Sequence, residues 1–449
     1  MSDVRRALAE AGFDENAVAE AVREAPFGEA APLAIRRRAE PLLQLFLLGD
    51  AVPSELLPVE ARTLEAAGLI ERDGDRVRPA VRLFPYEDLL IANDLDDRAE
   101  AGDYVPGVTN ASRTLAALTI RRNVGRALDL GTGCGLQALL LTRHAETVVA
   151  TDLNPRALEY VRLNAQLNGR SLETAAGNWF EPVANALFDL IAANPPFVIS
   201  PDNRLLYRDS ELGGEEVCRL LVRGAAARLR QDGHATVLCN WVRRSGGEPW
   251  APLADWVTGT GCDALLLANR PVDPFRYAAQ WNEPLLRDRA AFDRAVERWL
   301  EYYEREGIGA IGVGAVVLRR RDGDNWLRGY ELLMPATGAA GRQLQRLFAA
   351  ADRPLTDDDL LRTRFRLVEG HRLDQTLTYR GVYNPATVRM TLADGVGLVG
   401  LVDAATVEVL FAVDPCQELG RTIADLGAKP TEVLPTVRRL YEGGFLERG

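Results

Sequence analysis

Three short motifs follow one another in this chain, and each holds residue types able to bind or activate a small molecule. The first is a glycine-rich turn, Asp129-Leu130-Gly131-Thr132-Gly133-Cys134-Gly135, directly after a short apolar run. The second is Thr151-Asp152 and the third is Asn194-Pro195-Pro196-Phe197, each again after an apolar run. Ligands of a parallel sheet bind at the carboxyl ends of its strands. We therefore expect the three motifs to line one site.

The glycine turn suits a nucleoside that carries an amino acid. Gly131, Gly133 and Gly135 lack a Cβ atom, so the backbone can turn tightly and approach a ligand closely. Their spacing is G-x-G-x-G, which differs from the G-x-G-x-x-G of pyrophosphate binding. Asp129 is expected to anchor the loop or, through water, the cationic amino group of the ligand. For the glycines alone, a tight turn that binds nothing is the alternative.

Two further positions extend the expected cofactor site. Asp152 ends the second strand, where a carboxylate accepts hydrogen bonds from the ribose hydroxyls of a nucleotide. Asn178 follows the third strand within Gly177-Asn178-Trp179-Phe180. Its amide could meet an adenine amino group, and a neighbouring aromatic side chain could cover the adenine ring.

The third motif predicts methyl transfer onto a nitrogen. Its two prolines remove donors and stiffen the backbone, so that carbonyl groups are held facing outward. The Asn194 amide oxygen and the Pro195 carbonyl can each accept one hydrogen of a planar NH2 group, which directs the nitrogen lone pair toward a sulfonium methyl. Such a displacement needs positioning and electrostatics more than a strong base. Phe197 would stack on the flat acceptor. An ordinary Asn-Pro turn is the alternative.

The motifs resemble those of class I methyltransferases of the "small-domain" group, in sequence and in order. These enzymes methylate adenine N6 or guanine N2 of DNA or RNA, or a glutamine of release factors. The resemblance covers roughly residues 85–320 and implies S-adenosylmethionine as the cofactor. It implies that Asn194, Pro195, Pro196 and Phe197 form the catalytic motif. The cofactor contacts that it implies are Asp129, Gly131, Thr132, Gly133, Gly135, Asp152, Leu153, Asn178, Trp179 and Asn194.

Two other features bear on the substrate. Asp103–Gly107 sits where relatives carry a segment that closes over the methionine end of the cofactor. Phe rather than Tyr at position 197 leans toward RNA methylases, because release-factor enzymes usually show Tyr. Tyr207-Arg208-Asp209 and Gly213-Gly214-Glu215 form a polar loop after the motif, either a substrate lid or a plain connection.

A doubly wound parallel sheet would position these motifs. The fold class predicted is α/β, with a Rossmann-like seven-stranded class I methyltransferase sheet. Apolar runs predict strands at Ala127–Asp129, Val148–Thr151, Leu187–Ala192, His234–Cys239, Ala264–Ala268 and Gly309–Arg320. Helical patterns separate or follow them at Leu136–Thr142, Ala157–Leu167, Glu215–Arg230 and Phe292–Glu304.

The chain is predicted to hold three domains. Residues 1–85 would form a helical, winged-helix-like domain with a helix at Leu33–Leu48 and a hairpin across Asp73-Gly74. Residues 86–330 would form the methyltransferase domain. Residues 331–449 would form an α+β domain that ends in a winged-helix-like segment. Within it, strands are expected at Arg364–Val368, Thr376–Tyr379, Thr387–Leu392 and Thr406–Val413, and helices at Arg342–Ala350, Gln417–Leu426 and Glu432–Tyr441.

The chain ends on Gly444-Phe445-Leu446-Glu447-Arg448, which echoes Gly68-Leu69-Ile70-Glu71-Arg72. A repeated winged-helix element and a common helix-to-strand junction explain this equally well.

Composition and charge indicate where the protein is located and which binding partners are expected. The chain has 449 residues, 47% hydrophobic and 26% charged, and no long apolar run or leader pattern, so a cytoplasmic protein with no membrane partner is expected. Five scattered cysteines predict reduced buried thiols, with no metal. The net charge of -11 disfavours polyanion binding over the whole surface but allows a local basic patch.

The acceptor is predicted to be a macromolecule, with structured (ribosomal) RNA favoured. A protein or peptide amide, or a small metabolite, is the alternative and suits the acidic balance better. A non-catalytic winged-helix scaffold is the second alternative, which Asp152 and Asn194 argue against.

Overall fold

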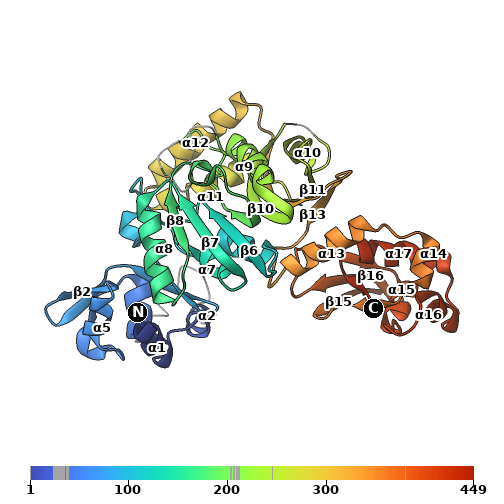
Figure 1. Ribbon diagram of the computed structural model, residues 1–449, viewed down its shortest axis with the longest axis horizontal. Helices are drawn as coiled ribbons and strands as arrows, with labels where there is room; N and C mark the ends of the chain where they lie inside the picture. Colours follow the sequence, from blue (N-terminus) through green and yellow to red (C-terminus); the bar gives the residue numbers. More distant parts are fainter. Residues whose placement is uncertain are drawn as a thin grey trace. The chain divides into compact units, whose positions relative to one another are not determined.

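The computed structural model describes residues 2–23, 36, 40–202, 205, 208, 213–244, 246–379 and 381–449 (Figure 1). The chain divides into two compact units. One holds residues 1–113, 122–240 and 297–302, and the other holds residues 114–121, 241–296 and 303–449. The three-domain division predicted from the sequence stays a prediction.

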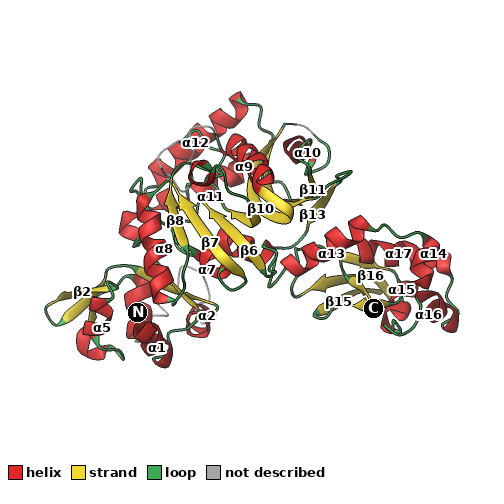
Figure 2. Cartoon of the chain, viewed as in Figure 1, coloured by secondary structure: helices red, strands yellow, loops and turns green. Residues whose placement is uncertain are grey.

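A mostly parallel sheet of eight strands, in the order β13-β11-β12-β10-β9-β6-β7-β8, carries the predicted strands (Figure 2). β6 pairs in parallel with β7 and β9, whereas β11 and β12 are antiparallel. The α/β class is therefore confirmed, with one strand more than the seven expected. The strands are β6 (Val124–Leu130), β7 (Ala145–Asp152), β8 (Glu173–Ala176), β9 (Phe188–Ala193), β10 (Leu229–Arg243), β11 (Cys262–Asn269), β12 (Ala310–Arg320) and β13 (Leu327–Leu332).

Helices alternate with these strands as the sequence predicted. The clearest boundary signal belongs to α8, where the Asn154 side chain accepts a 3.0 Å hydrogen bond from Arg156 N and Pro155 takes the first helical position. The helices of this region are α6 (Asn110–Leu118), α7 (Leu136–Leu141), α8 (Pro155–Leu167), α9 (Gly214–Arg228), α10 (Ala251–Val257), α11 (Pro274–Trp281) and α12 (Arg289–Arg305), with 3-10 turns η4 (Asp96–Arg98), η5 (Glu181–Val183) and η6 (Glu283–Arg287).

The N-terminal residues contain the predicted hairpin, β2 (Ile70–Asp73) with β3 (Arg76–Pro79). A second hairpin that was not predicted, β4 (Arg82–Tyr86) with β5 (Leu89–Asn93), follows it and leads toward the sheet. Part of the helix predicted at Leu33–Leu48 lies outside the described residues, and its described end forms the short α4 and the π-helical η2. The remaining elements are α1 (Ser2–Glu10), α2 (Glu15–Arg23), α4 (Pro41–Leu43), η2 (Gln44–Leu48), β1 (Val52–Pro53), η3 (Ser54–Leu56) and α5 (Ala61–Ala66).

The C-terminal residues pack helices and short strands around a core of their own. The strand predicted at Thr406–Val413 is wrong, because most of this run belongs to the helix α15 (Ala404–Phe411). The β-branched residues of this run suggest a strand, but Asp403 caps the helix by accepting from Thr406 N at 2.9 Å. The elements are α13 (Gly341–Asp352), α14 (Asp357–Arg362), β14 (Phe365–Leu367), β15 (His371–Tyr379), β16 (Tyr383–Leu392), β17 (Gly400–Val402), α15 (Ala404–Phe411), α16 (Leu419–Asp425), α17 (Pro430–Glu442) and β18 (Leu446–Arg448).

The sequence echo between the two ends is a shared helix ending. Gly68 and Gly444 both have a φ of 71°, and each follows a helix. Leu69 N donates to Leu64 O, and Phe445 N donates in the same way to Leu440 O. This is the Schellman pattern. Since Arg170 N donates to Ala165 O after α8 in the same way, the echo needs no repeated module, and the winged-helix assignments stay predictions.

Four of the five cysteines are buried, whereas Cys416 is exposed. Among the helices in the described ranges, none has both the length and the hydropathy required to cross a membrane.

Candidate active site

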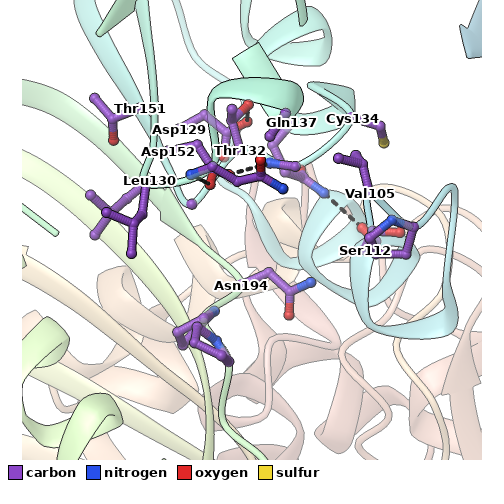
Figure 3. A pocket seen from close by; sticks show the side chains of 18 of the residues that line it. Val105, Ser112, Asp129, Leu130, Thr132, Cys134, Gln137, Thr151, Asp152 and Asn194 are labelled. Carbon is purple, nitrogen blue, oxygen red and sulfur yellow. Dashed lines mark hydrogen bonds between the residues drawn. The ribbon is translucent and has the colours of Figure 1, made fainter. Parts of the chain in front are cut away.

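A cavity of about 540 Å³ lies where β6, β7, β8 and β9 end (Figure 3). This volume falls within the range of roughly 300–1,000 Å³ typical of small-molecule sites. The structure brings all three motifs to it. The predicted site residues that line it are Asp129, Gly131, Thr132, Gly133, Asp152, Leu153, Asn178, Trp179, Asn194, Pro195 and Pro196, whereas Gly135 and Phe197 do not.

The glycine loop is bonded to the neighbouring strand β7. The amides of Gly131 and Thr132 both donate to Thr151 O at 2.9 Å. Gly131 and Gly133 have φ angles of 68° and 55°, which disfavour other residues. A Cβ at either position would meet no atom of the described residues within 4 Å. The loop therefore presents bare backbone to open space, as close approach of a ligand requires.

Gly135 serves packing instead of the cavity. Its φ is 86°, and a Cβ there would lie 3.1 Å from Val161 Cγ2 and 3.3 Å from Val161 Cα. Glycine at this position therefore lets the start of α7 approach α8.

Asp129 is buried beneath the loop, with 1% of its surface exposed. Its Oδ2 accepts hydrogen bonds from Thr132 Oγ1 at 2.6 Å and from Ala138 N at 2.9 Å. Burial raises the pKa of Asp129 to about 7, although these hydrogen bonds act to lower it. Asp129 was predicted to anchor the loop or to bind the amino group of the ligand through water. The structure shows the hydrogen bonds that anchor the loop.

Asp152 faces the cavity from the end of β7 and supports the loop as well. Its Oδ2 accepts from Gly133 N and its Oδ1 from Asn154 N, both at 2.9 Å. Burial raises the pKa of this carboxyl, against the effect of these hydrogen bonds. Because each carboxylate oxygen has two lone pairs, both can still accept from hydroxyl groups of a ligand.

The turn after β8 brings an amide and an indole ring to the cavity. Gly177 is required here, because a Cβ would lie 2.6 Å from Pro182 Cγ. Trp179 lines the cavity with a φ of 46°, a strained value for a non-glycine residue. Phe180 is buried and packs under the Arg228 guanidinium at 4.5 Å. The aromatic side chain available to a ligand in this turn is therefore Trp179.

Asn194 follows β9, and its side chain extends from the sheet toward the side of the cavity where Ser112 lies (Figure 3). The Oδ1 atom is buried and has no hydrogen-bond partner among the described residues. A buried acceptor without a partner costs about 1–3 kcal/mol. Asn194 thus lines the cavity and carries an unsatisfied acceptor.

The wall formed by residues 104–107 belongs to the segment that the sequence singled out. Asp94, 1% exposed, accepts from Val105 N at 2.8 Å and from Arg156 Nε at 2.9 Å. Asn154 Nδ2 donates to Asp103 O at 2.8 Å, which ties the same segment to the start of α8. Although burial acts to raise it, the pKa of Asp94 is lowered by hydrogen bonds from Arg156, Val105 and Tyr160.

Sequence reasoning missed Asp94 and Gln137. Gln137 Nε2 donates to Ser112 O at 2.7 Å, and both residues line the cavity (Figure 3). A single polar residue within the apolar helix α7 was the signal available. Of the polar loop predicted after the motif, Tyr207 and Asp209 lie outside the described residues.

Comparison with known proteins decides the family. The family model described as the methyltransferase small domain matches residues 106–244. A release factor glutamine methyltransferase from Cereibacter sphaeroides is 34% identical over 200 residues, which cover 40% of this chain and 68% of the relative. The chain belongs to the small-domain methyltransferases. The predicted family is confirmed.

Other relatives of this small-domain methyltransferase differ in the substrate that their names state. A release factor glutamine methyltransferase from Xylella fastidiosa is 34% identical over 129 residues, 26% of this chain and 47% of the relative. A ribosomal RNA small subunit methyltransferase C from Klebsiella pneumoniae is 30% identical over 136 residues, 30% of this chain and 36% of the relative. The chain thus spans about half the length of the first and less of the second.

Class I methyltransferases use S-adenosylmethionine, so the predicted cofactor is confirmed for this family, and the residues of the cavity fit it. Bare backbone at Gly131 and Gly133 leaves room for the amino acid part. The Asp152 carboxylate suits the ribose, and Asn178 and Trp179, predicted from the sequence to contact the adenine, line the same cavity.

Proposed function

We propose that this chain is an S-adenosylmethionine-dependent N-methyltransferase that acts on a planar amino or amide nitrogen. The observation that carries the proposal is Asn194, which lines the same cavity as Asp152 and the glycine loop and whose buried Oδ1 has no partner among the described residues. The cofactor, when bound, supplies a methyl group on a positively charged sulfur.

In this proposal the chain acts by orienting the acceptor. Asn194 Oδ1 and the Pro195 carbonyl accept the two hydrogens of the NH2 group, so the nitrogen lone pair turns toward the methyl group. Positioning of this kind accounts for much of the catalysis in a displacement between bound groups. Asp129 holds the glycine loop in place, and Pro195 and Pro196 keep the motif rigid. Stacking of Phe197 on the acceptor remains a prediction, since its side chain does not line the cavity.

We propose structured RNA as the acceptor, with residues 1–85 and 331–449 as flanking domains that hold it, and a cytoplasmic location. Phe rather than Tyr at position 197 supports RNA as the acceptor. The name of the Klebsiella relative, which states a ribosomal RNA substrate, supports it too. A protein amide is the second candidate, which the names of the Cereibacter and Xylella relatives support. The net charge of -11 also suits this candidate.

Transfer of tritiated methyl groups onto total RNA and total protein from a deletion strain tests both candidates. Label in RNA supports the first candidate, and label only in protein removes it in favour of the second. If neither is labelled and calorimetry detects no heat with S-adenosylmethionine, the chain is not a methyltransferase and the scaffold alternative holds.

A further inference from the structure

Asn164 on α8 and Asn168, the C-cap residue of the same helix, occupy the backbone groups of β5. Asn164 accepts from Ala92 N at 2.7 Å and donates to Ala92 O at 2.8 Å. Asn168 accepts from Leu90 N at 2.9 Å and donates to Leu90 O at 2.7 Å. The spacings match, because four residues of a helix and two residues of a strand both rise about 6–7 Å. Both side chains are buried, with 0% and 4% exposed.

The two asparagines differ in one bond. The second hydrogen of Asn164 Nδ2 goes to Cys134 O at 2.8 Å, whereas Asn168 Nδ2 donates to Asn164 O at 2.8 Å. Cys134 lies inside the glycine loop and lines the cavity. Asn164 therefore joins β5 to this loop, and Asn168 does not.

The hydrogen bond from Asn164 Nδ2 to Cys134 O adds to the support of the glycine loop. Gly131, Thr132 and Gly133 are bonded to Thr151 and Asp152 at the end of β7. The bond from Asn164 holds the opposite part of the loop, and both donors and the acceptor of its amide are engaged. No spare hydrogen is left to compensate if the loop moves away.

We propose that Asn164 is a positioning residue for cofactor binding that couples the β4–β5 hairpin to the glycine loop. The hairpin precedes residues 106–244, the part that the family model matches. Part of the cofactor affinity therefore depends on chain that lies outside the matched segment. The inference rests on the proposed function, since it takes S-adenosylmethionine as the ligand of the loop.

Asn168 offers a matched control for the test. Asn164→Ala, in α8, and Asn168→Ala, at its C-cap, remove the same type of side chain and an equivalent pair of bonds to β5. Both should lower the urea midpoint of unfolding to a similar extent. Only Asn164→Ala should weaken the affinity for S-adenosylmethionine in calorimetry, by about tenfold, while Asn168→Ala stays within about twofold of the wild type. Equal affinities in the two variants would overturn the inference.

A second measurement needs no cofactor. Hydrogen–deuterium exchange of residues 131–136 should be faster in Asn164→Ala than in Asn168→Ala, and equal exchange would contradict the coupling. If the wild type bound no S-adenosylmethionine, the proposed function would fail, and exchange would still decide the role of Asn164. Should either Ala variant not fold, the pair Asn164→Ser and Asn168→Ser replaces it, with the same expected contrast.

Discussion

The amide of Gly133 donates a 2.9 Å hydrogen bond to Oδ2 of Asp152, so the carboxylate at the end of β7 supports the loop at the end of β6. The same carboxylate faces the cavity. Asp152 therefore has two roles, one within the chain and one toward a ligand, and its replacement should affect both.

Asp152→Ala should weaken the binding of S-adenosylmethionine by about 100-fold, because two charge-assisted hydrogen bonds to hydroxyls are each worth about 1.5–3 kcal/mol. Asp152→Asn retains one acceptor and should show a smaller loss. Calorimetry measures both affinities. Wild-type affinity in Asp152→Ala would show that the cofactor lies elsewhere.

Asn194→Ala should lower turnover by about 100-fold or more, as losses of single orienting groups do. Affinity for S-adenosylmethionine should stay within about twofold of the wild type. Stability should not fall, because the substitution removes a buried oxygen that has no partner among the described residues. Single-turnover kinetics, calorimetry and urea unfolding together check this combination. A loss of cofactor affinity as large as in Asp152→Ala would make the assignment of the acceptor site wrong.

Stability should fall as pH rises through neutrality, in the absence of cofactor. The pKa of Asp129 is raised to about 7 by burial, whereas an unfolded Asp has a pKa of about 3.9. The folded state therefore binds the proton more tightly. The contribution of Asp129 to the free energy of unfolding is fully present below pH 4 and is lost as pH rises through 7. The loss is on the order of a few kcal/mol. The raised pKa of Asp152 acts in the same direction.

Urea unfolding of the wild type and of Asp129→Asn at pH 5 and pH 8 measures this effect. The wild type should lose more free energy of unfolding between the two pH values than the variant does. Equal losses would mean that Asp129 does not titrate in this range.

Gly107→Ala should disturb the cavity wall. A Cβ there would lie 2.4 Å from Oδ1 of the buried Asn93 and 2.7 Å from its Cγ, so the wall must shift. We expect a loss of about 1–3 kcal/mol in the free energy of unfolding, with weaker cofactor binding. Gly246→Ala is the control, because its Cβ would meet nothing within 4 Å and its φ is ordinary. Matching unfolding curves for the two variants would contradict the expected crowding.

The sequence predicted the parts of the site that local chemistry determines. Apolar runs mark the strands β6, β7 and β9, and each ends at a motif that lines the cavity. Gly131 and Gly133 could be assigned because only glycine adopts their φ angles without strain.

The parts that depend on distant contacts were missed or misassigned. The run from Thr406 has the β-branched residues of a strand, but its cap Asp403 also accepts from Thr436 of α17 at 2.6 Å, a contact no local pattern reveals. Phe197 does not line the cavity, and its stacking on the acceptor stays a prediction. Asn164 and Asp94 form bonds to residues far along the chain, and single-sequence patterns carry no such information.

Asn164 of α8 and its C-cap residue Asn168 also cover hydrogen-bonding groups of a strand edge. An unpaired strand edge is a template on which another chain can add a strand and start aggregation. At Leu90 and Ala92 of the β4–β5 hairpin, amide side chains already take up the hydrogen-bonding groups that such a chain would need. Loss of these side chains would therefore leave backbone groups of β5 unpaired at a strand edge. The protein would then be prone to self-association at high concentration.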